Sequence, residues 1–137
     1  MEKLLQDKKI LFVGNCGLDL SHNSRPKKEH QIEVLRLHFD LAQKFNKPMY
    51  FQSRSASVVF LSILKENRHK FKNGLMHSFT GTLTDMHELI KLNMFIGISG
   101  STLKRSLNST KKLLRSLPLN LMIIESSSPF CGFNPGS

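Results

Sequence analysis

Short apolar runs of strand length recur along this chain, with stretches of helical character between them. Five such runs are found, at residues 10–13, 49–51, 74–77, 94–98 and 121–124. Apolar runs that alternate with helices are typical of parallel strands buried on both faces of a sheet. The pattern therefore predicts an α/β fold.

Helical spacing is clearest in the segment 27–46, where apolar residues recur at intervals of three or four and give the helix one apolar face. Pro48 follows this segment as a stop signal. The apolar positions are Ile32, Leu35, Phe39 and Ala42. Further helices are expected at residues 55–70, 85–92 and 103–116.

The length of 137 residues, with 39% hydrophobic and 22% charged residues, suits one globular domain over residues 1–137. Residues 131–137 are rich in turn-forming residues and are expected to form a loose tail. No apolar stretch approaches the ~20 residues of a membrane span, and the N-terminus lacks a signal-peptide pattern. We therefore expect a cytoplasmic or nuclear protein without a membrane partner, in which Cys16 and Cys131 are reduced thiols.

Positive charge is in excess and is unevenly placed. The chain has 20 Lys and Arg against 10 Asp and Glu, a net charge of +10, and no acidic residue between Glu88 and Glu125. The basic residues of that interval are Lys91, Lys104, Arg105, Lys111, Lys112 and Arg115. Two interpretations stay open, a solvated basic helix face and a surface that binds the phosphates of nucleic acid.

Each apolar run ends in small or polar residues. These clusters lie at positions 15 and 19, 52–54, 77–80, 99–101 and 125–128. Because α/β barrels and open parallel sheets place their sites at the carboxyl ends of the strands, the clusters predict a site at that edge.

Four of these segments carry recognisable motifs. Residues 14–19 (Gly-Asn-Cys-Gly-Leu-Asp) resemble a Gly-Glu-Ile/Cys-Gly-Leu-Asp strand, and residues 48–54 (Pro-Met-Tyr-Phe-Gln-Ser-Arg) resemble a strand of the form Pro-hydrophobic-His-Ser/Cys-Arg. Residues 76–81 fit a His-x-Phe-Ser/Thr/Asp-Gly motif, and residues 124–130 are similar to a Glu-Thr-Asp-Ala-Pro-Tyr/Trp segment. In their order and approximate spacing, the four motifs resemble the TatD family of metal-dependent deoxyribonucleases. The cysteine at position 16 and the Cys131–Gly132 pair point to its eukaryotic branch.

The resemblance implies a TIM-barrel-like (β/α)₈ hydrolase fold, of which this chain supplies the last five β/α units as a partial barrel. Family members hold two divalent metal ions at the carboxyl end of the barrel and hydrolyse DNA phosphodiester bonds. The family's ligands come from a His-x-His pair on the first strand and from one residue in each of the four motifs. The pair has no counterpart here, because the chain begins near the position of the family's fourth strand.

The sequence departs from this ligand set at most of the positions it covers. Asn15 stands where the family has Glu, Gln52 where it has His, and Ser127 where it has Asp. His77 alone keeps a ligand identity, and a hydrogen-bonded residue at a strand end is the alternative interpretation. Asn and Gln hydrogen-bond, but they supply neither the negative charge nor the imidazole lone pair that a divalent site uses.

Other polar residues of the motifs are candidates for supporting roles. Arg54 either contacts substrate phosphate or forms a structural ion pair. Asp19 caps or braces its loop, and Glu125 is either a hydrogen-bond partner of a ligand or a buried structural residue. The remaining histidines are expected at the surface; they are His22, His30, His38, His69 and His87.

Three functional hypotheses follow. The first is a deoxyribonuclease homologue that is impaired or inactive because metal ligands are lost, with weak or no metal binding. The second is an active metal-dependent nuclease whose N-terminal part is supplied elsewhere or lost from the sequence. The third is a non-catalytic, basic nucleic-acid-binding protein that uses Lys104, Arg105, Lys111, Lys112 and Arg115. A partial barrel also leaves two strand edges open, so self-association or a complementary segment is expected.

Overall fold

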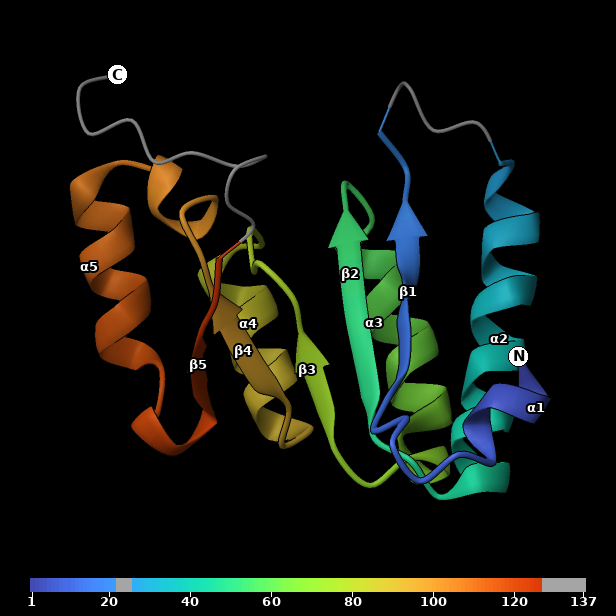
Figure 1. Ribbon diagram of the computed structural model, residues 1–137. Helices are drawn as coiled ribbons and strands as arrows, with labels where there is room; N and C mark the ends of the chain where they lie inside the picture. The colour runs from blue at the N-terminus through green and yellow to red at the C-terminus, as the bar shows by residue number, and fades with distance from the viewer. Residues whose placement is uncertain (22–25, 127–137) are drawn as a thin grey trace.

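The architecture is a single parallel sheet with helices against it, as seen in a computed structural model that describes residues 1–21 and 26–126. Five strands pair in the order β1-β2-β3-β4-β5 (Figure 1). Their bounds are Val13–Asp19, Met49–Arg54, Gly74–Met76, Phe95–Ile98 and Met122–Ile124. The α/β prediction is confirmed, whereas the expected tail at residues 131–137 lies outside the described residues.

Helices connect successive strands, as parallel pairing requires. The α-helices α1 to α5 are Glu2–Leu5, Lys28–Phe45, Ser57–Asn67, Leu83–Lys91 and Leu107–Ser116, and short 3₁₀ turns are at Arg68–Lys70, Thr102–Lys104 and Leu119–Leu121. Helix α4 begins two residues earlier than expected, because Thr82 and Asp85 form a capping box at its start. The helix expected at 103–116 is interrupted, since Arg105 is extended and Ser106 caps a new helix.

The first strand lies later in the chain than its apolar run predicted. Residues 10–12 are exposed and β1 starts at Val13, whose N–H donates to Pro48 at 2.9 Å. The strand instead continues through the motif to Asp19. Gly17 is required there, because a Cβ on it would lie 1.7 Å from the carbonyl oxygen of Gln52.

The core lies between the helices and one face of the sheet. Phe51 on β2 is fully buried and contacts the rings of Phe39, Phe60 and Phe71 at centroid distances of 5.5 to 5.8 Å. The neighbouring Tyr50 is only partly buried, because it points to the other face, which the helices do not cover. Burial on both faces is thus seen for β4, where Ile96, Gly97 and Ile98 are buried in succession, but not for β2, where buried and partly buried positions alternate. No helix of residues 1–21 and 26–126 is long and apolar enough to span a bilayer.

The two outermost strands each have one neighbour among the described residues, β2 for β1 and β4 for β5. An unpaired strand edge presents free N–H and C=O groups to other chains. We expect the purified 137-residue chain to self-associate, with a sedimentation coefficient that rises with protein concentration. Ile124→Lys on the β5 edge, 75% exposed, should reduce association, whereas Leu119→Lys, 84% exposed outside the sheet, should not. A concentration-independent monomer would contradict this expectation.

Candidate functional site

The carboxyl ends of β2, β3 and β4 surround an open cleft of about 380 Å³. Gln52 and Arg54 of β2 and His77, which follows β3, line this cleft. Gln52 and Arg54 also line a second hollow of about 510 Å³, which continues towards β1 and Asn15. Three of the four ligand positions inherited from the motifs are thus brought to one edge of the sheet. The fourth, Ser127, lies outside the described residues.

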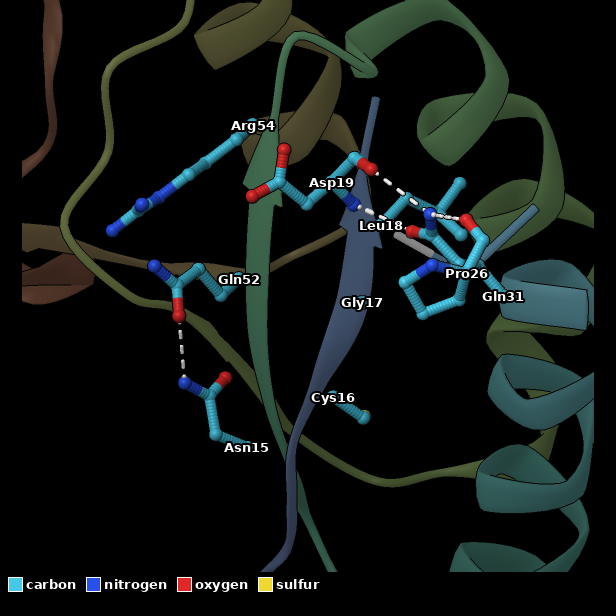
Figure 2. A pocket seen from close by; sticks show the side chains of 9 residues that line it. All are labelled: Asn15, Cys16, Gly17, Leu18, Asp19, Pro26, Gln31, Gln52 and Arg54. Atoms are coloured by element: carbon cyan, nitrogen blue, oxygen red, sulfur yellow. Dashed lines mark hydrogen bonds between the residues drawn. The ribbon is translucent and has the colours of Figure 1, made fainter. Parts of the chain in front are cut away.

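Asn15 reaches Gln52 because β1 is irregular at this point. Gly14 pairs with Tyr50 and Cys16 with Phe51, so Asn15 is the extra residue between two paired positions. Such bulges redirect a side chain and are frequent beside functional sites. The amides of Asn15 and Gln52 are 2.9 Å apart and hydrogen-bonded across the strands (Figure 2).

Arg54 sets the direction of this amide pair. With the Gln52 amide turned over, its oxygen accepts from Nε and Nη2 of Arg54 at 3.2 and 3.1 Å, and its nitrogen faces Asn15 at 2.9 Å. A guanidinium group only donates hydrogen bonds, so this orientation satisfies more partners than the reverse. Because an amide nitrogen cannot accept, the Asn15 amide must be turned over as well, and donation then runs from Arg54 through Gln52 to Asn15. Figure 2 shows the three side chains in sequence along this edge.

His77 is held by a second polar cluster. Its Nδ1 lies 2.8 Å from Oε2 of Glu125 and 2.7 Å from the hydroxyl of Tyr50. Because a carboxylate only accepts, Nδ1 carries the proton when Glu125 is ionised, and the lone pair is left on Nε2. A carboxylate that orients an imidazole in this way is a common support of metal-bound histidine. The hydrogen bond between His77 and Glu125 is compatible with a structural role and with a ligand role of His77. It holds the ring at the strand end, and it leaves the lone pair on Nε2.

Tyr50 and Gly97 complete this cluster, and sequence reasoning missed both. The Tyr50 hydroxyl donates to Oε2 of Glu125 at 3.2 Å, and burial together with the adjacent carboxylate raises the pKa of Tyr50 to about 12. Gly97 on β4 leaves room for the carboxylate, because a Cβ there would lie 2.1 Å from Oε1. Tyr50 lies in an apolar run of the sequence. Its hydroxyl group was the available sign that its side chain faces away from the core.

Asp19 is hydrogen-bonded to the segment that follows β1 and to α2. Its carboxylate accepts from the hydroxyl and the N–H of Ser21 at 2.6 and 2.9 Å, and these bonds lower the pKa of the Asp19 carboxyl. Gln31 on α2 donates to the Asp19 carbonyl at 2.9 Å and accepts from its N–H at 2.8 Å. Arg54 is the register partner of Asp19, yet within the described chain it forms no ion pair.

The basic residues of the C-terminal half do not line the cleft of Arg54. Arg105 donates to the Gly81 carbonyl at 2.9 Å, and with Lys112 it lines a separate hollow of about 250 Å³ beside α5. The remaining three expected DNA contacts are exposed side chains; they are Lys104, Lys111 and Arg115. Arg105 is therefore a structural residue in part, while the other four form a basic surface on and before α5.

The other candidate ligands are not brought together. His30, His69 and His87 are exposed as expected, whereas His38 is half-buried and its Nδ1 lies 2.7 Å from the Val34 carbonyl of its own helix. Cys16 is a buried free thiol, and burial raises its pKa to about 12, which removes it as a nucleophile at neutral pH. His22 and Cys131 lie outside the described residues.

Comparison with known proteins agrees with the motifs and the fold. The sequence model of the family described as TatD related DNase matches residues 1–136. The chain belongs to the TatD family. It is 36% identical over 128 residues to a putative deoxyribonuclease TATDN1 homolog of Encephalitozoon cuniculi, covering 93% of this chain and 44% of that protein. It is 29% identical to the uncharacterized metal-dependent hydrolase YabD of Bacillus subtilis, covering 98% of this chain and 52% of YabD.

Solved structures of TatD proteins share the fold. The crystal structure of YJJV, a TatD homolog from Escherichia coli, superposes with a TM-score of 0.86 at 26% identity, covering 98% of this chain and 52% of YJJV. A TatD-family hydrolase from Entamoeba histolytica gives 0.84 at 27% identity, covering 99% and 44%. The partial-barrel prediction is thereby confirmed. The chain spans about half the length of the relatives it matches.

The described residues at the motif positions, Asn15, Gln52 and His77, do not by themselves supply the ligands of a two-metal centre. Among residues 1–21 and 26–126 no three His, Cys, Asp or Glu side chains are grouped as a metal site would require. Asn15 and Gln52 are neutral and bonded to each other, and Glu125 is occupied by His77, Tyr50 and the Ser78 N–H. Among the three described motif positions, His77 alone is of a residue type that the family uses as a ligand.

The coupling of Tyr50 to Glu125 can be measured directly, because Tyr50 is the only tyrosine. Glu125→Gln should move the pKa of Tyr50 part of the way from about 12 towards its ordinary 10.0, since the negative charge is removed while burial remains. The measurement is an alkaline titration followed by ultraviolet absorbance. Glu88→Gln is the matched control, because Glu88 pairs with Lys65 and Lys91 at the surface. An unchanged tyrosine titration in Glu125→Gln would show that the cluster does not form.

Proposed function

We propose that this TatD homologue binds nucleic acid without hydrolysing it through a two-metal centre of its own. The observation that carries the proposal is the chain of hydrogen bonds from Arg54 through Gln52 to Asn15, which occupies two of the inherited ligand positions. Divalent ions in hydrolases polarise the phosphoryl group and activate water, and they need several anionic or imidazole ligands. Here the amides satisfy each other instead.

Electrostatics support nucleic acid as the partner. The net charge of +10 attracts polyanions, and the exposed bases Lys104, Lys111, Lys112 and Arg115 lie on or just before α5. Relatives are named for the same class of substrate, among them the ssDNA/RNA exonuclease TatD of Klebsiella pneumoniae. A surface of flexible side chains contacts phosphates but reads no base edge, so binding is sequence-independent.

Nuclease chemistry is tested with the whole chain. We expect no chelator-sensitive cleavage of DNA in the presence of Mg²⁺, Mn²⁺ or Zn²⁺, and no stoichiometric binding of these ions by calorimetry. The combined change Asn15→Glu, Gln52→His and Ser127→Asp should create measurable metal affinity, because it restores two carboxylates and an imidazole at the ligand positions of the motifs. The matched control is the same type of change away from the edge, Asn108→Glu with Gln43→His. Cleavage by the unmodified chain that stops on addition of chelator would overturn the proposal.

DNA binding should fall steeply with salt. The affinity decreases by about 0.9 logarithmic units per contacted phosphate for each tenfold increase in salt. Changing Lys104, Lys111, Lys112 and Arg115 to Gln should weaken binding and flatten this slope in fluorescence anisotropy. The control removes four exposed lysines elsewhere, at positions 8, 9, 27 and 28, which leaves the same net charge. Equal losses in both variants would show that overall charge, and not the α5 surface, carries the binding.

A further inference from the structure

The cleft beyond β2, β3 and β4 has the composition of an anion site. Six of its lining residues carry hydroxyl groups, Arg54 supplies a positive charge, and no described residue that lines it is acidic. The hydroxyl residues are Ser21, Ser53, Ser55, Ser78, Thr80 and Ser101. Its volume of about 380 Å³ is within the range of small-molecule sites, ~300 to 1,000 Å³.

Arg54 is held in position without being neutralised. Gln52 accepts from Nε and Nη2 of Arg54, and an amide oxygen fixes the guanidinium plane but leaves its charge. The Nη1 group makes no hydrogen bond within the described chain, so it remains available to a ligand. A planar guanidinium with free donors is suited to bind two oxygens of one phosphate group.

No carboxylate of the described chain forms an ion pair with Arg54. Glu125 accepts from Tyr50, His77 and the Ser78 N–H, and it does not line the cleft. Asp19 lines the neighbouring hollow and accepts twice from Ser21 through Oδ1; these bonds, and to a lesser extent the charge of Arg54, lower the pKa of Asp19. Neither group therefore competes with a ligand for Arg54 by a direct ion pair.

Several donors of the cleft have no partner. The hydroxyls of Ser55, Thr80 and Ser101 make no hydrogen bond with described residues, so they are free to donate to an oxygen-rich ligand. The Oγ of Ser53 is also without a partner, but it is buried and does not face the ligand space. Ser55 and Ser78 also adopt left-handed backbone, with φ of 49° and 48°, a conformation that is costly for serine and concentrates at ligand sites.

We propose that this cleft binds a phosphate group directly, without a metal ion, through Arg54 and the surrounding hydroxyls. The proposal deepens the proposed function, since it names the subsite that takes one phosphate of the nucleic acid. In this site the guanidinium and hydroxyl donors take the place of the positive charge that metal ions supply to a phosphoryl group. Binding needs no covalent step and no co-reactant.

The test is calorimetric titration of the full chain with inorganic phosphate, a deoxynucleoside 5′-monophosphate and a dinucleotide, each in excess EDTA. We expect binding in EDTA, at least tenfold weaker in Arg54→Gln and intermediate in Arg54→Lys, which keeps the charge and loses the planar fork. Arg36→Gln is the matched control, because Arg36 is 58% exposed and pairs only with Glu66 at the surface. Preference for the monophosphate or the dinucleotide identifies a terminal or an internal phosphate as the natural source.

A second variant protects the test against a folding defect in Arg54→Gln. Ser101→Asp keeps Arg54 and adds a negative charge inside the cleft, so it should abolish phosphate binding, whereas Asn108→Asp adds the same charge at the start of α5 and should not. Absence of binding in EDTA, or equal affinity in Arg54→Gln and Arg36→Gln, overturns the phosphate site. Metal-dependent cleavage of DNA would overturn the proposed function alone, so the two failures are distinguishable.

Discussion

The polar edge of this protein depends on the placement of one carboxylate, that of Glu125. It follows β5, yet it accepts hydrogen bonds from Tyr50 on β2 and from His77 and Ser78 after β3, and it lies over Gly97 of β4. One side chain therefore contacts residues on or directly after three other strands, β2, β3 and β4. Because β3 and β5 are each only three residues long, their ladders are short, and this cross-link adds order where backbone pairing is weakest.

The two polar clusters have opposite electrostatic character, although they share β2. Around Glu125 a negative charge is surrounded by donors, and the tyrosine is kept protonated. Around Gln52 the positively charged Arg54 donates to the Gln52 amide, which in turn donates to Asn15. A metal centre would require acceptors to converge on one point. Here each group along the strand ends donates a hydrogen bond to the next one. Neutral amides are therefore satisfied at positions where a bound cation would require anionic ligands.

Much of the fold could be predicted from periodicity, because apolar runs and helical faces report burial directly. The strands at Met49 and Phe95 and the helix Lys28–Phe45 lie close to their expected ranges. The start of β1 could not be predicted, since Ile10 to Phe12 are apolar but exposed, and pairing begins only where Val13 donates to the carbonyl of Pro48, just before β2. The different burial of Tyr50 and Phe51 on β2 could not be predicted either, because both are aromatic and only three-dimensional packing distinguishes them.

The candidate site, too, was predictable only in part. The motifs gave the positions Asn15, Gln52 and His77, and the structure brings all three to one edge. Which neighbours they have was not readable from the sequence, because the partners are distant along the chain. Tyr50 and Glu125 are 75 residues apart, and Gly97 matters only through the space it leaves.

The basic surface of α5 and the cleft of Arg54 are separate parts of this molecule, so each would act on nucleic acid in a different way. At about 0.1 M salt, attraction between exposed charges is screened over about 10 Å. The lysines of α5 do not line the cleft of Arg54, so they do not determine how a phosphate lies against the guanidinium. Long-range charge acts mainly on the rate of encounter, whereas fixed short-range donors act on the lifetime of a complex. In the proposed function the α5 surface therefore gathers the polyanion, and the cleft of Arg54 retains one of its phosphates.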